Sequence, residues 1–161
     1  VYANYKPSGR GYYHQSGTPQ IPGRDYVFSS PAPLFCLGFG LSYTTFNYNN
    51  LVVNNTFSKG GNTIDVSFDI CNTGKHDGAD VAQLYVRDVV SSVTTPVKSL
   101  KAFKKVYLKQ GETQKVSLQI KKEDLMLWNK QMKRELEPGE FKLYIGESAE
   151  DVKLEGNFEV L

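Results

Sequence analysis

The sequence has little cysteine, and its two cysteines are not arranged as a metal site or a redox pair. Cys36 and Cys71 lie in segments of different character, and neither has a CxxC partner. We therefore expect two buried free thiols rather than one disulfide. His14 and His76 are far apart in sequence, so no metal site is expected.

The chain also lacks a predominant charge and a long hydrophobic run. Nineteen Lys and Arg residues against seventeen Asp and Glu residues leave a net charge of +2, which argues against a nucleic-acid partner. No apolar run approaches the roughly 20 residues that span a bilayer, so membrane insertion is not expected. Hydrophobic residues make up 40% of the 161 residues, which is typical of one globular domain, or of one domain with an appendage.

The composition changes near residue 46 and divides the chain into two parts. Residues 1–45 contain five of the seven prolines and six of the ten tyrosines, without a periodic apolar face. Such a segment cannot bury itself, so we expect it to lie against another surface or to be disordered. Because the chain begins at Val1 and not at a methionine, we also expect it to be a piece of a longer protein.

Residues 46–161 alternate between apolar and polar side chains with a period of two, which is typical of half-buried strands. Short turn sequences rich in Gly, Asn and Asp separate the alternating runs. About seven short antiparallel strands predict an all-β fold, a β-sandwich of the immunoglobulin or fibronectin type III kind, preceded by an irregular N-terminal strip. The alternating runs include residues 64–70, 82–87, 116–121, 141–145 and 158–160.

One stretch departs from the alternation. Lys122–Leu125 fits one turn of helix, and the apolar residues that follow it end at Trp128, the single tryptophan. We expect Trp128 to be a core or inter-domain anchor rather than a platform for a sugar ring.

Candidate catalytic groups are few. Glycoside hydrolysis needs two carboxyl groups that face one bond, and the pairs present here lie beside lysines or in turn-like sequence. We expect these pairs and the basic cluster Lys101, Lys104 and Lys105 to be solvated surface. The pairs are Glu123 with Asp124, Glu135 with Glu137, and Glu150 with Asp151.

Polar and aromatic side chains converge outside any strand pattern at one place. Arg10, Tyr12, Tyr13 and His14 combine charged donors with aromatic faces, which suits sugar rings. These residues are the candidate substrate-adjacent site. The favoured alternative is that this strip simply packs along a neighbouring domain.

Ordered sequence blocks cover nearly the whole chain. Residues 38–46, GFGLSYTTF, resemble the block that opens the C-terminal domain of family 3 glycoside hydrolases, and LWNKQM at 127–132 is similar to the periplasmic bacterial β-glucosidases. The remaining blocks are NTGK at 72–75, DGADV at 77–81, QLYVRD at 83–88, PVKSLKAF at 96–103, LKQGET at 108–113 and EPGEF at 137–141.

The resemblance implies a fibronectin type III-like domain at residues 46–161, with the end of an α/β sandwich domain and a linker at residues 1–45. In this family the nucleophilic aspartate lies in an N-terminal (β/α)₈ barrel, and the acid/base glutamate usually lies in the α/β sandwich domain. Both precede the region matched here, so no position of this chain receives a catalytic role. The implied role is structural, with those two catalytic domains as partners and a homodimer contact left open.

The resemblance also implies the chemistry of the parent enzyme. That reaction is retaining hydrolysis of terminal β-D-glucosyl residues of β-linked glucosides or oligosaccharides, without a metal or organic cofactor, in the periplasm or outside the cell. β-Xylosides are the closest alternative substrates.

Two other functions remain open. An independent carbohydrate-binding or adhesion module would need exposed aromatic residues in a row, and Tyr85, Tyr107 and Tyr144 lie opposite the apolar series of their strands. If the chain were itself a hydrolase, the purified chain would cleave a chromogenic β-glucoside, and we expect no such turnover.

Overall fold

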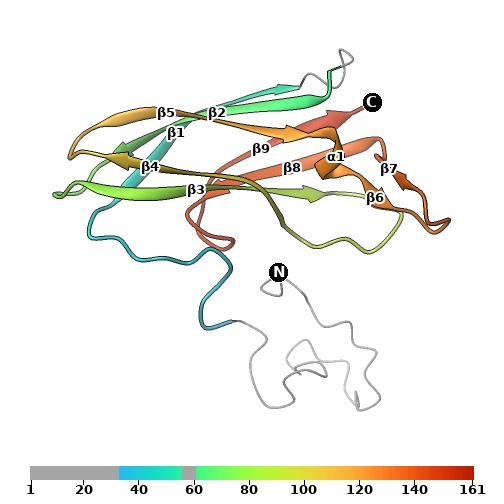
Figure 1. Ribbon diagram of the computed structural model, residues 1–161, viewed down its shortest axis with the longest axis horizontal. Coiled ribbons are helices and arrows are strands. Elements are labelled where there is room, and N and C mark those ends of the chain that lie inside the picture. The colour runs from blue at the N-terminus through green and yellow to red at the C-terminus, as the bar shows by residue number, and fades with distance from the viewer. Residues whose placement is uncertain (1–32, 56–60) are drawn as a thin grey trace.

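A computed structural model describes residues 33–55 and 61–161 of the chain. These residues form strands with one four-residue helix between them (Figure 1). In chain order the elements are β1 (Phe46–Asn55), β2 (Thr63–Asn72), β3 (Gly78–Asp88), β4 (Ser99–Leu108), β5 (Thr113–Lys121), α1 (Lys122–Leu125), β6 (Leu127–Trp128), β7 (Arg134–Glu135), β8 (Gly139–Gly146) and β9 (Val152–Val160).

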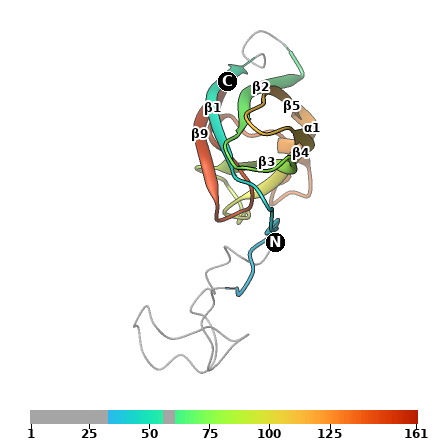
Figure 2. The same ribbon diagram turned by 90° about the vertical axis from the view of Figure 1, so that its left-hand side faces the viewer.

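The strands form a β-sandwich, as the period of two predicts. One sheet has the strand order β1-β2-β5 and the other has the order β4-β3-β8-β9, and every pairing is antiparallel. The two sheets face each other, with β1 beside β9 and β4 beside β5 (Figure 2). The seven strands of these two sheets agree with the number expected from the sequence.

The alternating side chains make the core between the sheets. In β2, the side chains of Ile64, Val66, Phe68 and Ile70 are fully buried, and the residues between them are only partly covered. Full burial of one such side chain contributes about 1.5–3 kcal/mol, so the repeated alternation of several strands stabilises the sandwich. The core also contains stacked rings, such as Phe141 and Phe158 with centroids 5.3 Å apart.

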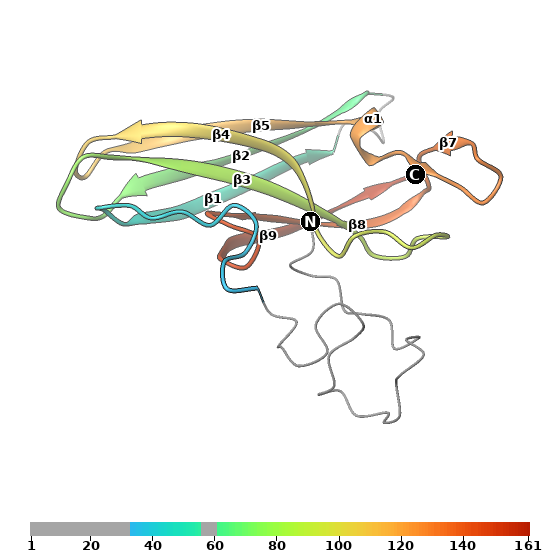
Figure 3. The same ribbon diagram turned by 60° about the horizontal axis from the view of Figure 1, so that its bottom comes forward.

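The connection from β5 to β8 corrects the prediction for Trp128. The helical turn α1 forms where the sequence indicates it, and its Leu125 enters the core. Trp128 then lies in the small β6–β7 hairpin beyond the sandwich, and 60% of its surface is exposed (Figure 3). Trp128 is therefore not a core residue. The residues next to the hairpin that contact the core are Leu125 before it and Leu136 after it. The role of Trp128 as an inter-domain anchor stays a prediction.

The two cysteines are free thiols, as expected, but neither is fully buried. Both Cys36 and Cys71 are half-buried. Cys36 precedes the first strand, and Cys71 lies near the end of β2 on the side of the sheet away from the core, which explains their partial exposure.

Candidate functional site at the anchors of the N-terminal segment

The residues that lead into β1 form a segment without regular secondary structure, residues 33–45, which we call the strap. The strap runs along the sandwich below β3 before it enters β1 (Figure 1). Much of its hydrophobic surface faces outward, with exposed fractions of 90% for Leu34, 65% for Phe35, 92% for Leu41 and 97% for Tyr43. Its path is nevertheless fixed, because its backbone is held at two places that we call the first and second anchor.

The first anchor is centred on Gln83 of β3, a polar side chain that is only 5% exposed. Its Nε2 donates to the carbonyl of Gly38 at 3.1 Å and to the carbonyl of Glu147 at 2.5 Å. Its Oε1 accepts a hydrogen bond of 2.5 Å from the hydroxyl of Tyr85. Gln83 thus joins the strap to the turn between β8 and β9; its bond to Tyr85 is buried, and its bonds to the two carbonyls are partly buried.

The backbone of the strap fits this anchor closely. Gly38 has a φ of +82°, and a Cβ atom at this position would lie 1.9 Å from Oε1 of Gln83. Only glycine satisfies both the left-handed conformation and the close approach. Directly before it in the chain, the Leu37 carbonyl accepts from the Ala149 N–H at 2.9 Å, and the Cys36 thiol donates to the Ser148 hydroxyl at 3.2 Å.

Two of the three tyrosines proposed as a sugar-binding row belong to this anchor and are buried. Tyr85 is 1% exposed and Tyr144 is 9% exposed, and they pack with Ala149, while Tyr107 is 63% exposed. Burial raises the pKa of Tyr85 to about 12. The Nζ atom of Lys98 lies 5.1 Å from the centroid of the Tyr144 ring and donates a hydrogen bond to the Ala149 carbonyl. Tyr85 and Tyr144 therefore do not supply the row of exposed aromatics that a carbohydrate-binding module would need, because the β8–β9 turn and the strap cover this part of the sheet.

The second anchor is Asn72, which is fully buried at the end of β2. Its Oδ1 accepts from the Thr44 hydroxyl at 2.6 Å and from the Gly74 N–H at 3.1 Å. Its Nδ2 donates to the carbonyls of His76 at 2.8 Å and Leu108 at 3.1 Å. One side chain therefore connects the strap, the β2–β3 loop and the end of β4.

A buried ionisable pair lies between the sheets near the start of the sandwich. The hydroxyl of Tyr48 in β1 donates to Oδ2 of Asp80 in β3 at 2.5 Å. Burial is the main cause that raises the pKa of Tyr48 well above its ordinary value, and the bond to Asp80 adds to it. Burial also raises the pKa of Glu147, helped by the charge of Asp80 and opposed by Lys153.

These acidic groups do not form a recognisable metal site. Within residues 33–55 and 61–161, no group of three or more His, Cys, Asp and Glu side chains is arranged to hold a metal ion. In the same part of the chain, no helix has the length and apolar character that crossing a membrane requires.

The carboxylate pairs considered for glycoside chemistry lie mostly at the surface. Glu137 is the half-buried carboxylate of these pairs, and it accepts hydrogen bonds from the hydroxyl and the N–H of Ser92. These two hydrogen bonds lower the pKa of Glu137. These bonds give it a local structural role between two loops. The exposed members are Glu123, Asp124, Glu135, Glu150 and Asp151.

The basic cluster is only partly solvated. Lys104 and Lys105 are exposed, as expected, but Lys101 is half-buried. Its Nζ donates to the Asp124 carbonyl at 2.5 Å, and burial lowers its pKa. This position coincides with an irregularity in the β3–β4 register, between Leu84 and Tyr85, at which Lys101 has no cross-strand partner.

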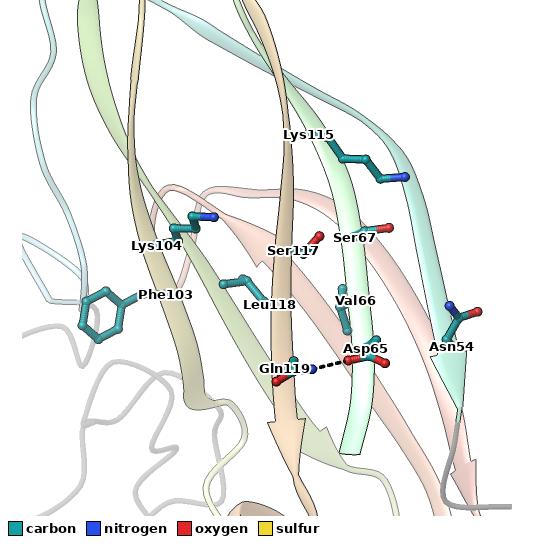
Figure 4. Close-up of a pocket in the computed structure, with 10 residues that line it drawn as sticks. All are labelled: Asn54, Asp65, Val66, Ser67, Phe103, Lys104, Lys115, Ser117, Leu118 and Gln119. Carbon is teal, nitrogen blue, oxygen red and sulfur yellow. Dashed lines mark hydrogen bonds between the residues drawn. The ribbon is translucent and has the colours of Figure 1, made fainter. Parts of the chain in front are cut away.

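An open hollow of about 640 Å³ is lined by residues of β1, β2 and β5 from one sheet and by Phe103 and Lys104 of β4 from the other (Figure 4). Its floor contains the cross-strand pair Ser67 and Ser117, and its rim includes Lys104 and Lys115. The Gln119 amide donates to Asp65 at 2.7 Å, so part of its polar surface is already paired. The hollow brings together no aromatic platform beyond Phe103 at its edge. The other candidate binding residues, Arg10, Tyr12, Tyr13 and His14, lie outside the described residues.

Comparison with known proteins identifies the sandwich. Residues 80–149 match the family model described as "Fibronectin type III-like domain". The chain carries a fibronectin type III-like domain. It is 39% identical, over its whole length, to the periplasmic beta-glucosidase of Salmonella typhimurium and covers 21% of that protein. It is 45% identical to a beta-xylosidase of Formosa agariphila, over 80% of this chain and 18% of that protein.

Solved structures agree with these relatives. A beta-glucosidase from Listeria innocua in complex with glucose matches 99% of this chain with a TM-score of 0.77 and 31% identity, and the match covers 22% of that chain. Beta-glucosidase 3B from Thermotoga neapolitana matches 81% with a TM-score of 0.75 and 36% identity, covering 18% of that chain. The chain thus spans about a fifth of the length of these relatives, and it corresponds to the fibronectin type III-like domain of family 3 glycoside hydrolases.

The sequence blocks that carry the family resemblance meet at the two anchors. Asn72 and Gly74 come from NTGK, Gln83 and Tyr85 from QLYVRD, and Gly38 from the opening block. The sequence showed the blocks without showing that they contact one another. Their convergence indicates that the blocks hold the strap on the fibronectin type III-like domain.

Proposed function

We propose that the chain is the non-catalytic structural domain of a larger β-glucosidase, which it stabilises by docking on the catalytic part. The observation that carries this proposal is the strap, which buried and partly buried hydrogen bonds hold in place while Leu34, Phe35, Leu41 and Tyr43 expose large hydrophobic surfaces. Exposed apolar surface of this extent is typical of a surface that another part of a protein covers.

The proposal extends to the parent enzyme. Its partners in the same polypeptide are a (β/α)₈ barrel and an α/β sandwich domain, which carry the catalytic carboxylates. The parent hydrolyses terminal β-D-glucosyl residues with retention of configuration, and it acts in the periplasm or outside the cell. The periplasmic and β-glucosidase descriptions of the Salmonella relative support these assignments, as does the fraction of the relatives that the chain covers. Residues 1–45 are proposed to be the end of the preceding domain and the linker, with residues 46–161 as the structural domain.

Deletion of residues 46–161 from the complete enzyme tests the structural role. We expect the truncated enzyme to lose thermal stability and activity together, because its hydrophobic docking surface would be exposed to water. A truncated enzyme with unchanged kcat/KM and melting temperature would refute the proposal.

The purified 161-residue chain tests the two competing functions. We expect it neither to hydrolyse p-nitrophenyl β-glucoside nor to bind cello-oligosaccharides in calorimetry. Turnover would show a hydrolase in this chain, and binding would show an independent carbohydrate-binding module.

A further inference from the structure

The two outer faces of the sandwich differ in polarity. The outer face of the β1-β2-β5 sheet carries mostly small or polar side chains, and Val52 is an exposed apolar exception. The outer face of the other sheet carries large apolar side chains on β3 and β4. An exposed apolar face of this kind is typical of a surface that is covered in the complete protein, whereas a polar face suits contact with water.

The strand register places the apolar residues of the second face close together. Phe103 is opposite Gln83, Tyr107 is opposite Ala79, and Leu100 is opposite Tyr85 across the β3–β4 pair. Phe103 is 68% exposed and Tyr107 is 63% exposed, although both lie in the part of β4 that pairs regularly with β3.

The strap continues this apolar surface. Its Gly38 accepts a hydrogen bond from Gln83, whose cross-strand partner is Phe103, so the strap lies on the same outer side of the sheet as Phe103. Phe35 and Phe39 pack together on the strap with ring centroids 5.0 Å apart. We call the combined surface the β4 face, and it consists of Phe35, Phe39, Val81, Leu100, Phe103 and Tyr107.

We propose that the β4 face is the surface on which the preceding part of the same polypeptide docks, and that the opposite face remains in water. This inference rests on the proposed function and adds to it the orientation of the domain. The occupant is the preceding part because the strap is the segment that connects the sandwich to it, and this segment is itself part of the apolar surface.

The charge on the β4 face gives the chemistry of the occupant. Lys105 lies between Phe103 and Tyr107 on the outward side of β4 and is exposed. A covering surface must therefore either pair this ammonium group or leave it a path to water, because a buried unpaired charge is strongly unfavourable. The occupant is therefore an apolar surface that either presents a carboxylate or a carbonyl to Lys105 or leaves its ammonium group a path to water.

Hydroxyl-radical footprinting tests the inference by comparing the 161-residue chain with the complete enzyme. We expect labelling of Phe103 and Tyr107 to fall at least fivefold in the complete enzyme. Val52, which is exposed on the outer face of the β1-β2-β5 sheet, is the internal control and keeps its labelling. Equal labelling of Phe103 and Tyr107 in both proteins would overturn the inference, as would protection of Val52 in their place.

A pair of variants gives a second, independent readout. Phe103→Glu should lower the melting temperature of the complete enzyme by several degrees and leave that of the 161-residue chain nearly unchanged. Asn47→Glu, on the outer face of β1 and outside the hollow that Phe103 borders, should leave both unchanged. If deletion of residues 46–161 destabilises the enzyme but Phe103→Glu does not, the structural role holds and the orientation is wrong. If the deletion has no effect, the proposed function itself fails.

Discussion

Replacement of Asn72 by alanine removes the side chain that the second anchor depends on. The amide of Asn72 makes four hydrogen bonds, with the Thr44 hydroxyl, the Gly74 N–H and the carbonyls of His76 and Leu108. Alanine can make none of them. The partners are held by three different segments, so they cannot easily pair with one another after the substitution.

The expected cost follows from which of these partners water can reach. The bonds to Thr44 and Leu108 are buried, whereas those to Gly74 and His76 are only partly buried. A buried polar group left without a partner costs about 1–3 kcal/mol, and a partner that water can reach costs much less. We therefore expect Asn72→Ala to lower the free energy of unfolding by about 3 kcal/mol. For a domain of this size that corresponds to a decrease of roughly 10 °C in the melting temperature.

Urea unfolding of the 161-residue chain, followed by tryptophan fluorescence and circular dichroism, measures this change. Asn47→Ala is the matched control, because Asn47 is an exposed asparagine in the neighbouring strand β1, and it should change the free energy by less than about 0.5 kcal/mol. If Asn72→Ala costs less than about 1 kcal/mol, or no more than Asn47→Ala, the buried network does not stabilise the domain as argued.

Two further predictions concern the first anchor and the buried tyrosine. Gly38→Ala should release the strap and speed proteolysis within residues 34–43 about tenfold, because the new Cβ would clash with Gln83. Gly40→Ala is the control, because a Cβ at this position meets nothing within 4 Å, and it should leave the rate of proteolysis unchanged. Equal rates for the two variants would exclude the tight fit at Gly38. Because the folded pKa of Tyr48 is raised, its contribution to stability is complete below pH 10 and is lost above it, by up to about 1.4 kcal/mol per pH unit. Unfolding titrations from pH 9 to 11 should show a shallower loss for Tyr48→Phe, and an identical slope would argue against this assignment.

The overall fold could be predicted from the sequence because its signal is local. The alternation from Ile64 to Ile70 and from Val116 to Ile120 defines which side of each strand faces the core, and turn residues separate the strands. Leu125 shows the same point for the short helix, which forms where the pattern indicates it.

The candidate site could be predicted only in part. The blocks around Asn72 and Gln83 were visible, but an asparagine after a strand or a glutamine within one is ordinary in a β-sandwich sequence. Their importance comes from bonds to Thr44 and Gly38, which lie 28 and 45 residues away in the chain. Tyr85 and Tyr144 occupy positions that would be solvated in a bare sheet, so the alternation alone predicted them to be exposed.

The strands, the side of each strand that forms the core and the family resemblance follow from the order of the residues alone, since each depends on neighbours along the chain. The tertiary structure decided which outward side chains are covered. The strap and the β8–β9 turn bury Tyr85, Tyr144 and Gln83, whereas Trp128 stays exposed on its hairpin. The physical reason is that burial of an outward position depends on which distant segment crosses it, and the period of a strand contains no information about that segment.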